Sequence, residues 1–505
     1  MSNRYSLLPR DSNQALGLGQ YAIDFLSGAG QPDESVLAKT EQFHLDSVAC
    51  GYAALSINAN APTILREEAL DYSLETSDAR GAFCVGSTQP VRAEKAILAN
   101  CSAVRELDAN GTNFGYNPAT GDCRGEFGHN DFYPVCVAAA QQRGLDGRQT
   151  LLAMVCLDEI RGRLAEVFAL KDHKIDHVLH GAIASAAVYG AMLGATAEQI
   201  ESAIGLVVAH HVPFRAIRHG HQLSDSKGAS AAISTEAAIV SLQRAKRGFV
   251  GPRNIFRNPQ AVFCLFEPPS EPDQSPFDLR LSLSGDDFAV MGMHFKLGLY
   301  EHQSAGAIAG LIAVLQDHPA VLDDPNNIDS IGITIYEPAF SIIGDPHKRD
   351  PRTRQSADHS MVYIIATLLR KAIERKTSGW RELMLVPEDY SDEAIVHPLT
   401  RKLIDKIDFR HGGPDYDAKY PDGIPTSLEI SHRQLGTLSS GLVMYPLGHA
   451  RHNGEGFSET LDDKFNALAG LGCEDVPALR ERVFPLAEKS AAEVRSLYST
   501  ELCSS

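Results

Sequence analysis

The stretch LLAMVCLDEIRGRLAEVFAL, residues 151–170, repeats apolar side chains at every third or fourth position. This spacing places those side chains on one face of a helix. The same period occurs in three other segments, residues 13–28, 35–56 and 230–248. Together the four segments predict a large helical domain in the first half of the chain.

The pattern changes after about residue 250. The stretch EPPSEPDQSPFDLRLSLSGDD, residues 267–287, is rich in Pro, Ser and Asp and indicates a linker or surface excursion between domains. Beyond it, residues 328–340 place Ile side chains in a strand-like pattern, and residues 356–373 are helical again. Residues 426–448 predict two strands joined by a tight turn. This part of the chain therefore predicts an α+β unit.

The chain has 505 residues, of which 44% are hydrophobic, and this length exceeds what one hydrophobic core usually supports. Helical spacing returns after about residue 460, and these last helices most simply rejoin the first domain. We therefore predict a mainly α protein with two domains. The large helical domain comprises residues 1–275 and 446–505, and the smaller α+β domain comprises residues 276–445.

Composition narrows the partners and the compartment. Lys and Arg number 46 against 64 Asp and Glu, a net charge of -18, which disfavours nucleic acid or an anionic membrane as a partner. The N-terminal residues lack the apolar core of a secretory signal, so we expect a cytoplasmic location. The uncharged run of residues 178–197 is rich in Ala and Gly and contains His180, which favours a buried helix over a membrane span.

The nine cysteines include no CxxC pair. Their spacing predicts neither a disulfide framework nor a zinc site, and it lacks the clustered thiolates of an iron–sulfur centre. We expect buried, unreactive thiols.

A locally basic segment, residues 210–227, stands out in this acidic chain. It contains four His together with Arg215, Arg218 and Lys227, against one acid, Asp225. A pocket that concentrates positive potential on a bound anion would explain it. A solvated face that pairs with nearby carboxylates is the alternative, and the segment alone does not decide between them.

Two further segments carry polar side chains suited to chemistry. Residues 107–131 form a long Gly- and Asn-rich stretch with the candidates Asp108, Thr112 and His129, although capping and packing are ordinary roles for such residues. Residues 171–185 contain His173 and His177 at the i, i+4 spacing of some metal ligands, and His180. No HExxH pattern or matching carboxylate accompanies them, so we predict no metal site.

A resemblance rests on motifs that follow one another along almost the whole chain. They are HLDSVACGYAAL (44–55), RELDANGTN (105–113), GHND (128–131), KIDHVLHGAIASAAVYGAMLG (174–194), RAIRHG with Lys227, ADHSMVY (357–363), YPLGHARH (445–452) and DDKF (462–465). With these motifs the chain resembles the MmgE/PrpD family, which includes 2-methylcitrate dehydratase, cis-aconitate decarboxylase and iminodisuccinate epimerase. The DHVL and YPLGHAR segments are most similar to the dehydratase branch.

The resemblance implies a site in the cleft between a helical domain and an α+β lid, in a homodimer that needs no metal or organic cofactor. It also assigns site residues. Asp108, Thr112, His129 and His177 match the family's active-site loop and second histidine, Lys227 matches the lysine that meets a substrate carboxylate, and Lys296 and His302 match a lysine and a histidine near the lid boundary.

The chain departs from the dehydratase pattern at several positions. Gly111 and Asn113 stand where dehydratases have Asp and Trp, and Phe340 occupies the tyrosine position of the decarboxylase branch. These departures leave the substrate open.

The chemistry common to the family can be argued from the residues. Removing a proton next to a carboxylate adds negative charge to a polyanion, which Lys227, Lys296 and Arg218 could stabilise. Histidine suits both the base that takes the proton and the acid that protonates a departing hydroxide. We hypothesise that His129 and His177 share these roles, and that Asp108 orients an imidazole or binds the substrate hydroxyl.

The function we predict is a cofactor-independent hydro-lyase that dehydrates 2-methylcitrate to 2-methylaconitate. Decarboxylation of cis-aconitate or an iminodisuccinate-type epimerisation is the alternative, because each starts from the same stabilised carbanion. A catalytically silent scaffold that keeps the family fold is the third reading.

Overall fold

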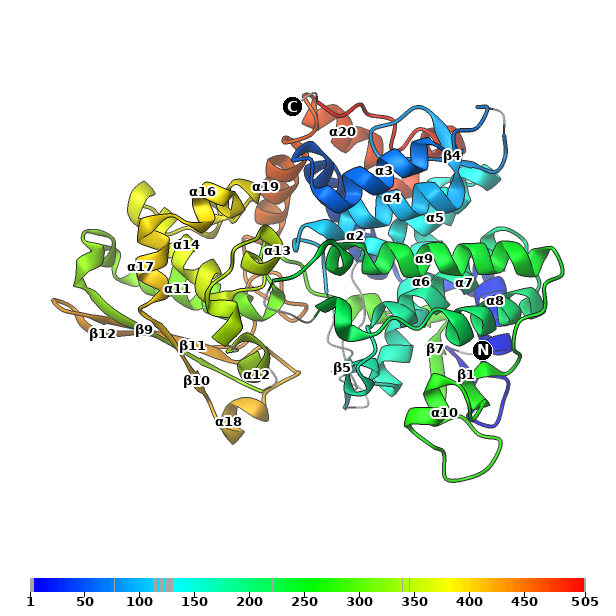
Figure 1. The fold of residues 1–505 in the computed structure, drawn as a ribbon, viewed down its shortest axis with the longest axis horizontal. Coiled ribbons are helices and arrows are strands. Elements are labelled where there is room, and N and C mark those ends of the chain that lie inside the picture. Colours follow the sequence, from blue (N-terminus) through cyan, green and yellow to red (C-terminus); the bar gives the residue numbers. More distant parts are fainter. Residues whose placement is uncertain are drawn as a thin grey trace.

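The computed structural model describes residues 4–76, 78–112, 116–117, 121–123, 130–218, 222–337, 339–344 and 346–503. Figure 1 shows a large helical lobe and a smaller lobe with a sheet. The predicted class, mainly α with a smaller α+β part, is confirmed.

The large lobe is built from long helices that pack on one another. They are α1 (Gln14–Asp24), α2 (Glu34–Ser56), α3 (Asn60–Leu70), α4 (Ala93–Glu106), α5 (Tyr133–Arg143), α6 (Gly147–Val167), α7 (Val178–Met192), α8 (Ala197–His210) and α9 (Asp225–Lys246). α6 begins where the Asp146 side chain accepts a hydrogen bond from the Gln149 backbone N–H at 2.9 Å. α7, the Ala-rich run, is almost entirely buried as predicted, because its small side chains allow neighbouring helices to approach closely. Within the described ranges, no helix combines the length and apolar character that crossing a bilayer requires.

Two strand pairs join the N-terminus to the middle of the chain. β1 (Tyr5–Leu8) pairs with β7 (Leu279–Ser282), and β2 (Gln31–Pro32) pairs with β8 (Ser284–Gly285). Both middle strands, β7 and β8, fall within the predicted smaller domain, which starts at residue 276. The domain limits remain a proposal, and these pairings favour a later start for the smaller domain.

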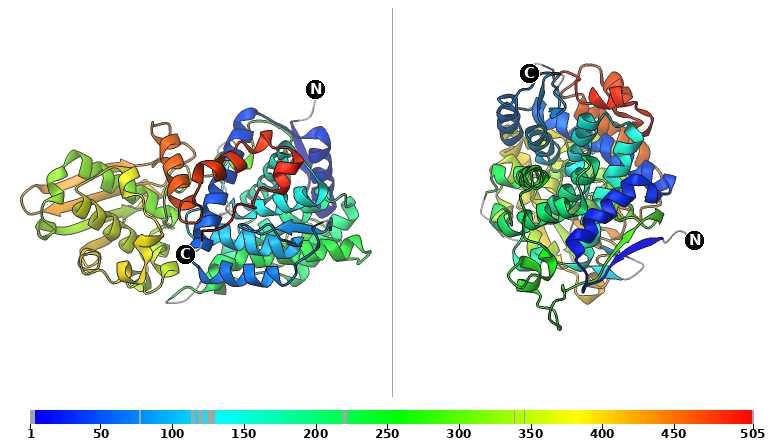
Figure 2. Two further views of the ribbon diagram at one scale, coloured as in Figure 1. Left: turned by 90° about the horizontal axis from the view of Figure 1, so that it is seen from above. Right: turned by 90° about the vertical axis from the view of Figure 1, so that its right-hand side faces the viewer.

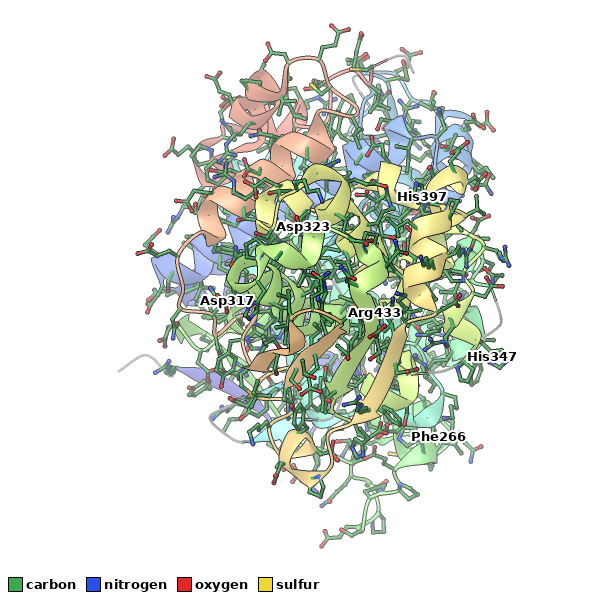
Figure 3. The ribbon with its side chains drawn as sticks, turned by 90° about the vertical axis from the view of Figure 1, so that its left-hand side faces the viewer. Phe266, Asp317, Asp323, His347, His397 and Arg433 are labelled. Carbon is green, nitrogen blue, oxygen red and sulfur yellow. The ribbon has the colours of Figure 1, made fainter. Side chains whose placement is uncertain are left out.

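The smaller lobe contains a four-stranded sheet in the order β10-β9-β11-β12. Its strands are β9 (Ile328–Ile335), β10 (Ile407–His411), β11 (Thr426–His432) and β12 (Gly436–Val443). β9 runs parallel to β10 and antiparallel to β11. α11 (Ala305–Asp317) packs on β11 and β12. Figure 3 labels Arg433 at the predicted tight turn between β11 and β12, where Gly436 has φ +77°.

The last helices lie against the large lobe (Figure 2). α19 (Phe457–Ala469) packs on α2, and α21 (Ala491–Arg495) packs on α5. The thiols predicted to be buried are buried at Cys50, Cys84, Cys101, Cys136, Cys156, Cys264 and Cys473, whereas Cys503 is partly exposed.

Candidate active site

Asp108 lies in the loop that follows α4, and three cations and one imidazole surround its buried carboxylate. Oδ1 forms an ion pair with Lys296 and lies 3.2 Å from Nη1 of Arg105. Oδ2 lies 3.1 Å from Nδ1 of His359. Burial alone would raise the pKa of Asp108, but Lys296, His359, Lys227 and Arg105 outweigh it and hold the pKa well below its usual range. Asp108 is therefore ionised, and it contacts an imidazole.

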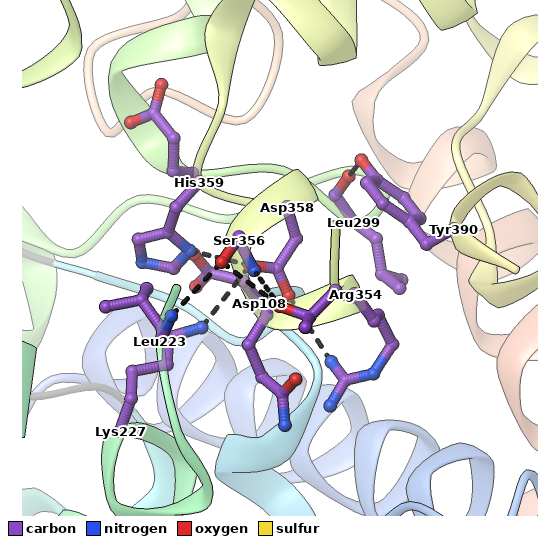
Figure 4. Close-up of polar contacts among 12 residues, drawn as sticks. Asp108, Leu223, Lys227, Leu299, Arg354, Ser356, Asp358, His359 and Tyr390 are labelled. Atoms are coloured by element: carbon purple, nitrogen blue, oxygen red, sulfur yellow. Dashed lines mark hydrogen bonds and ion pairs between the residues drawn. The ribbon is translucent and has the colours of Figure 1, made fainter. Parts of the chain in front are cut away.

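Lys227, in the first turn of α9, faces a second buried carboxylate. Its Nζ lies 3.4 Å from Oδ1 of Asp358, in the loop between α13 (Arg354–Ala357) and α14 (Met361–Arg375). Oδ2 of Asp358 lies 3.3 Å from Nη1 of Arg354. Burial lowers the pKa of Lys227 to about 8, although Asp358 and Asp108 counteract it. Figure 4 shows these contacts.

His359 joins the two carboxylates. Its Nδ1 lies 2.7 Å from Oδ1 of Asp358 as well as 3.1 Å from Asp108. Burial and the charge of Lys227 lower the pKa of His359 to about 4, against the effect of both aspartates. The ring is therefore neutral at pH 7. Because a carboxylate only accepts, the single ring proton must be on Nδ1, and Nε2 carries the lone pair.

A second group forms around Asp176, just before α7. Arg218 pairs with its carboxylate, with Nη2 3.2 Å from Oδ1, and Nδ1 of His177 lies 3.5 Å from the same oxygen. Burial lowers the pKa of His177 to about 3 despite the attraction of Asp176, and the charges of Arg218 and Arg105 lower it further. Arg105 also contacts Asp108, so it electrostatically links the two groups.

Thr112 and His302 lie next to the Lys296 segment. The backbone of Thr112 exchanges two hydrogen bonds with that of His294, at 3.0 and 2.7 Å. The rings of His294 and His302 stack with centroids 4.9 Å apart. Burial and the charge of Lys296 hold the pKa of His302 well below its usual range.

Contacts from α2, α19 and Asn130 hold the loop that carries Asp108. Lys464 of α19 contacts Asp46 of α2 and donates to the Ala109 carbonyl at 2.5 Å. Asn130 accepts from the Gly111 backbone N–H at 2.9 Å and donates to the Phe43 carbonyl at 2.7 Å. The loop is therefore fixed from several sides by buried hydrogen bonds.

Two protein-family models match most of the chain. Residues 28–275 match the MmgE/PrpD N-terminal domain, and residues 301–484 match the MmgE/PrpD C-terminal domain. The chain belongs to the MmgE/PrpD family.

Several curated relatives in this family carry the name 2-methylcitrate dehydratase. The Escherichia coli K12 protein is 25% identical over 332 residues, which is 64% of this chain and 64% of that protein. The mitochondrial protein of Yarrowia lipolytica is 25% identical over 472 residues, 87% of this chain and 81% of that protein. The Cupriavidus necator protein is 25% identical over 431 residues, 82% and 81% of the two chains. The match to the E. coli protein thus covers less than two thirds of that relative.

The structure places the residues expected from the sequence in two adjoining groups. Asp108, Thr112, Lys227, Lys296 and His302 lie around the first, and His177 and Arg218 lie in the second. The positions His129, Asn113 and His219 lie outside the described residues.

The basic segment of residues 210–227 is partly buried in the candidate site and partly exposed to solvent, so each of the two interpretations given above, an anion pocket and a solvated face, fits part of it. Lys227 is buried at the first group, and Arg218 pairs with Asp176 in the second. His210 and His211 are exposed. Lys227 and Arg218 both pair with carboxylates of the chain itself. These ion pairs account for the positions of the two cations without a bound anion.

Gly111, a departure from the dehydratase pattern, has a steric reason in this chain. A Cβ at this position would lie 2.4 Å from the Phe43 ring. That ring is stacked on Phe295, with centroids 3.8 Å apart, and cannot easily move away.

Sequence reasoning missed Asp358, His359 and Arg105 as site residues, although the motifs that carry the resemblance contain all three. An available signal was the Asp-His dipeptide, which occurs at 172–173, 176–177, 317–318 and 358–359. At 176–177 and at 358–359 the structure puts the imidazole next to a buried carboxylate.

Asp108, Asp358 and His359 are also the group of described residues whose donor atoms lie close enough to hold a metal ion, all within 4.8 Å of one another. Both carboxylates already have ammonium partners, Lys296 and Lys227. A divalent cation at this position would meet their repulsion, so the donor set fits a metal poorly. The other histidine considered for metal binding, His173, lies 3.1 Å from Glu267.

Proposed function

We propose that this protein is a hydro-lyase acting on a small polycarboxylate, with the dehydration of 2-methylcitrate to 2-methylaconitate as the first candidate reaction. The observation that carries the proposal is the buried cluster in which Lys227 and Lys296 meet Asp108, Asp358 and a neutral imidazole. The names of the family relatives supply the substrate class.

The cluster has the charges that the reaction needs. Removing a proton beside a carboxylate places additional negative charge on the substrate, and fixed ammonium groups in a dry site stabilise that charge most effectively. Lys227 and Lys296 are 0% and 2% exposed. A substrate carboxylate would replace Asp108 or Asp358 as a partner of Lys296 or Lys227. Substrate binding therefore requires some of these ion pairs to separate.

In the proposed mechanism, His129 and His177 share proton transfer, and Asp108 orients an imidazole. The contact between Asp108 and His359 supports the orienting role of the carboxylate. Thr112, Arg218 and His302 complete the substrate site. Arg218 would act partly through Asp176, because it is already paired there.

Decarboxylation and epimerisation remain the alternatives, because the same cations would stabilise the same carbanion. Phe340, at the tyrosine position of the decarboxylase branch, lies against His411 in the smaller lobe, with ring centroids 5.7 Å apart. It has no hydroxyl to donate a proton, which favours dehydration over decarboxylation. A silent scaffold is disfavoured, because scaffolding gives no reason to bury so many paired charges.

Incubation of the purified protein with 2-methylcitrate, citrate, cis-aconitate and iminodisuccinate tests the proposal. Absorbance of a new conjugated alkene reports dehydration, release of CO2 reports decarboxylation, and loss of optical rotation reports epimerisation. We expect alkene from 2-methylcitrate. If neither 2-methylcitrate nor citrate gives an alkene, release of CO2 would favour the decarboxylase and loss of optical rotation would favour the epimerase. If none of the four compounds changes, the silent scaffold would be the remaining reading.

Assembly and location belong to the same proposal. We expect a homodimer, which light scattering during gel filtration measures. We expect the cytoplasm as the compartment, although the name of the Y. lipolytica relative includes the word mitochondrial, so cell fractionation is the check.

A further inference from the structure

The ring of His359 is more exposed than the other described imidazoles of the site, and its contacts leave Nε2 available to a ligand. Both carboxylates are on the Nδ1 side of the ring (Figure 4). Within the described part of the chain, the hydrogen bond and the ion pairs of this ring all involve Nδ1. The side chain is 21% exposed, compared with 8% for His177, and His302 is buried. His359 therefore presents an accessible lone pair at the edge of the cluster.

The two carboxylates prepare this lone pair to accept a proton. Each is held ionised by a cation, Asp108 by Lys296 and Asp358 by Lys227. An imidazolium formed on His359 would therefore lie between two negative charges that are already in place. The hydrogen bonds to Nδ1 also fix the tautomer and the ring orientation.

Substrate binding would strengthen the base. In the structure, burial and the charge of Lys227 keep the ring neutral. A polycarboxylate that engages Lys227 and Lys296 would neutralise part of their charge and add negative charge near the ring, and both effects favour the protonated form. The base would thus become stronger in the complex.

We propose that His359, through Nε2, is the base that removes the proton from the substrate carbon. This inference rests on the proposed function and deepens it. The C–H bond breaks as an N–H bond forms on Nε2, and the C–H electron pair becomes the second bond of the new C=C. The C–O bond on the neighbouring carbon breaks, and the hydroxide leaves as water with a proton from a second group. His359 then releases its proton to solvent and the second group takes one up from solvent, so both residues are restored and the balance is substrate to alkene plus water.

The other histidines take the remaining role. The proton for the departing hydroxide would come from His177 or His129, so the pair named above supplies the acid and His359 the base. His177 has its Nδ1 next to one carboxylate only, that of Asp176, which is paired with Arg218. His359 faces two carboxylates, and this difference favours His359 as the stronger proton acceptor of the two.

The variant His359→Asn separates catalysis from positioning. The Asn amide occupies the place of the Nδ1–H group and can still donate to a carboxylate, but it offers nothing at the place of Nε2. We expect kcat to fall by ~10²–10⁴-fold, the usual contribution of a general base, with KM changed by less than about threefold. Exchange of the substrate's carbon-bound proton with deuterated water should fall in parallel. The control is His318→Asn, at an exposed position after α11, which should retain wild-type kinetics.

The outcomes distinguish this inference from the function on which it rests. A wild-type protein that changes none of the four compounds would overturn both. A wild-type protein that dehydrates 2-methylcitrate, together with a His359→Asn variant that keeps its kcat and its proton exchange, would overturn the role of His359 alone. A rise in KM with kcat unchanged would likewise overturn the base assignment, since it is what a positioning role would produce.

Discussion

Lys464 of α19 forms a buried ion pair with Asp46 of α2, although 418 residues separate them in the sequence. The same ammonium group donates to the Ala109 carbonyl, one residue after Asp108. One lysine near the C-terminus therefore connects the second helix of the chain to the loop of the candidate site.

Removing Lys464 should destabilise the large lobe strongly. Lys464→Met leaves the Asp46 carboxylate buried without its cation, and breaking such a pair costs about 3–5 kcal/mol. The free energy of unfolding from urea denaturation measures the loss. The control is Arg433→Gln, which removes the ion pair of Arg433 with Asp329 at 2.7 Å on the surface, where the two side chains are 62% and 46% exposed. That change should cost less than about 1 kcal/mol, and equal losses in the two variants would contradict the buried pair's role.

Gly111 should tolerate no side chain. In Gly111→Ala the new methyl meets the Phe43 ring, so we expect a loss of about 1–3 kcal/mol and lower activity, because the loop must shift. Gly51→Ala is the matched control, since a Cβ there meets nothing nearer than 3.7 Å and Gly51 lies within α2. Thermal unfolding of both variants should show a lower midpoint for the first and an unchanged or higher midpoint for the second. A stable, fully active Gly111→Ala would disprove the clash.

The sequence predicted the local elements of this fold well, because helical and strand periods are local properties. α2, α6 and α9 lie within a few residues of the predicted segments. The helix predicted from residue 356 begins instead at Met361, since the Ser360 side chain caps it by accepting from the Tyr363 N–H. The residues before that cap turn into the site and include Asp358 and His359.

Contacts between distant segments could not be read in the same way. Lys227 was visible through its basic surroundings in an acidic chain, but its partner Asp358 is 131 residues away. The pairing of β1 with β7 also joins distant segments, and neither strand has a period that specifies its partner. Tertiary pairing decides which of several polar side chains meet, and a single sequence contains that information only indirectly.

Lys227 should act mainly in substrate binding. Lys227→Ala removes a buried ammonium group, and a hydrogen bond to a charged group contributes about 1.5–3 kcal/mol, so we expect KM to rise by roughly 10- to 150-fold. Steady-state kinetics with the active substrate provide the measurement. Lys246→Ala, in the last turn of the same helix, is the control and should leave KM unchanged. An unchanged KM for Lys227→Ala would count against the carboxylate role.

His177 should be needed for turnover. His177→Ala should lower kcat by ~10²–10⁴-fold if its ring transfers a proton. His173→Ala tests a histidine four residues earlier, which lies 3.1 Å from Glu267 and should leave kcat near the wild-type value. Near-normal turnover of purified, folded His177→Ala would remove this residue from the mechanism.

His44, buried in α2, should make folding sensitive to acid. Burial lowers its pKa from 6.5 to about 3, and within the described part of the chain neither ring nitrogen has a hydrogen-bond partner. Below pH 6.5 the unfolded chain binds a proton at this ring that the folded chain does not, so stability is complete above pH 6.5 and is lost as the pH falls toward 3. In His44→Leu this loss is absent, so the variant should gain roughly 1.4 kcal/mol over wild type between pH 7.5 and pH 5.5. Urea unfolding of both proteins at the two pH values measures the difference. His318→Leu, at an exposed position, is the control for removing a histidine, and a pH-independent difference between wild type and His44→Leu would show that His44 gains its proton while the chain is folded.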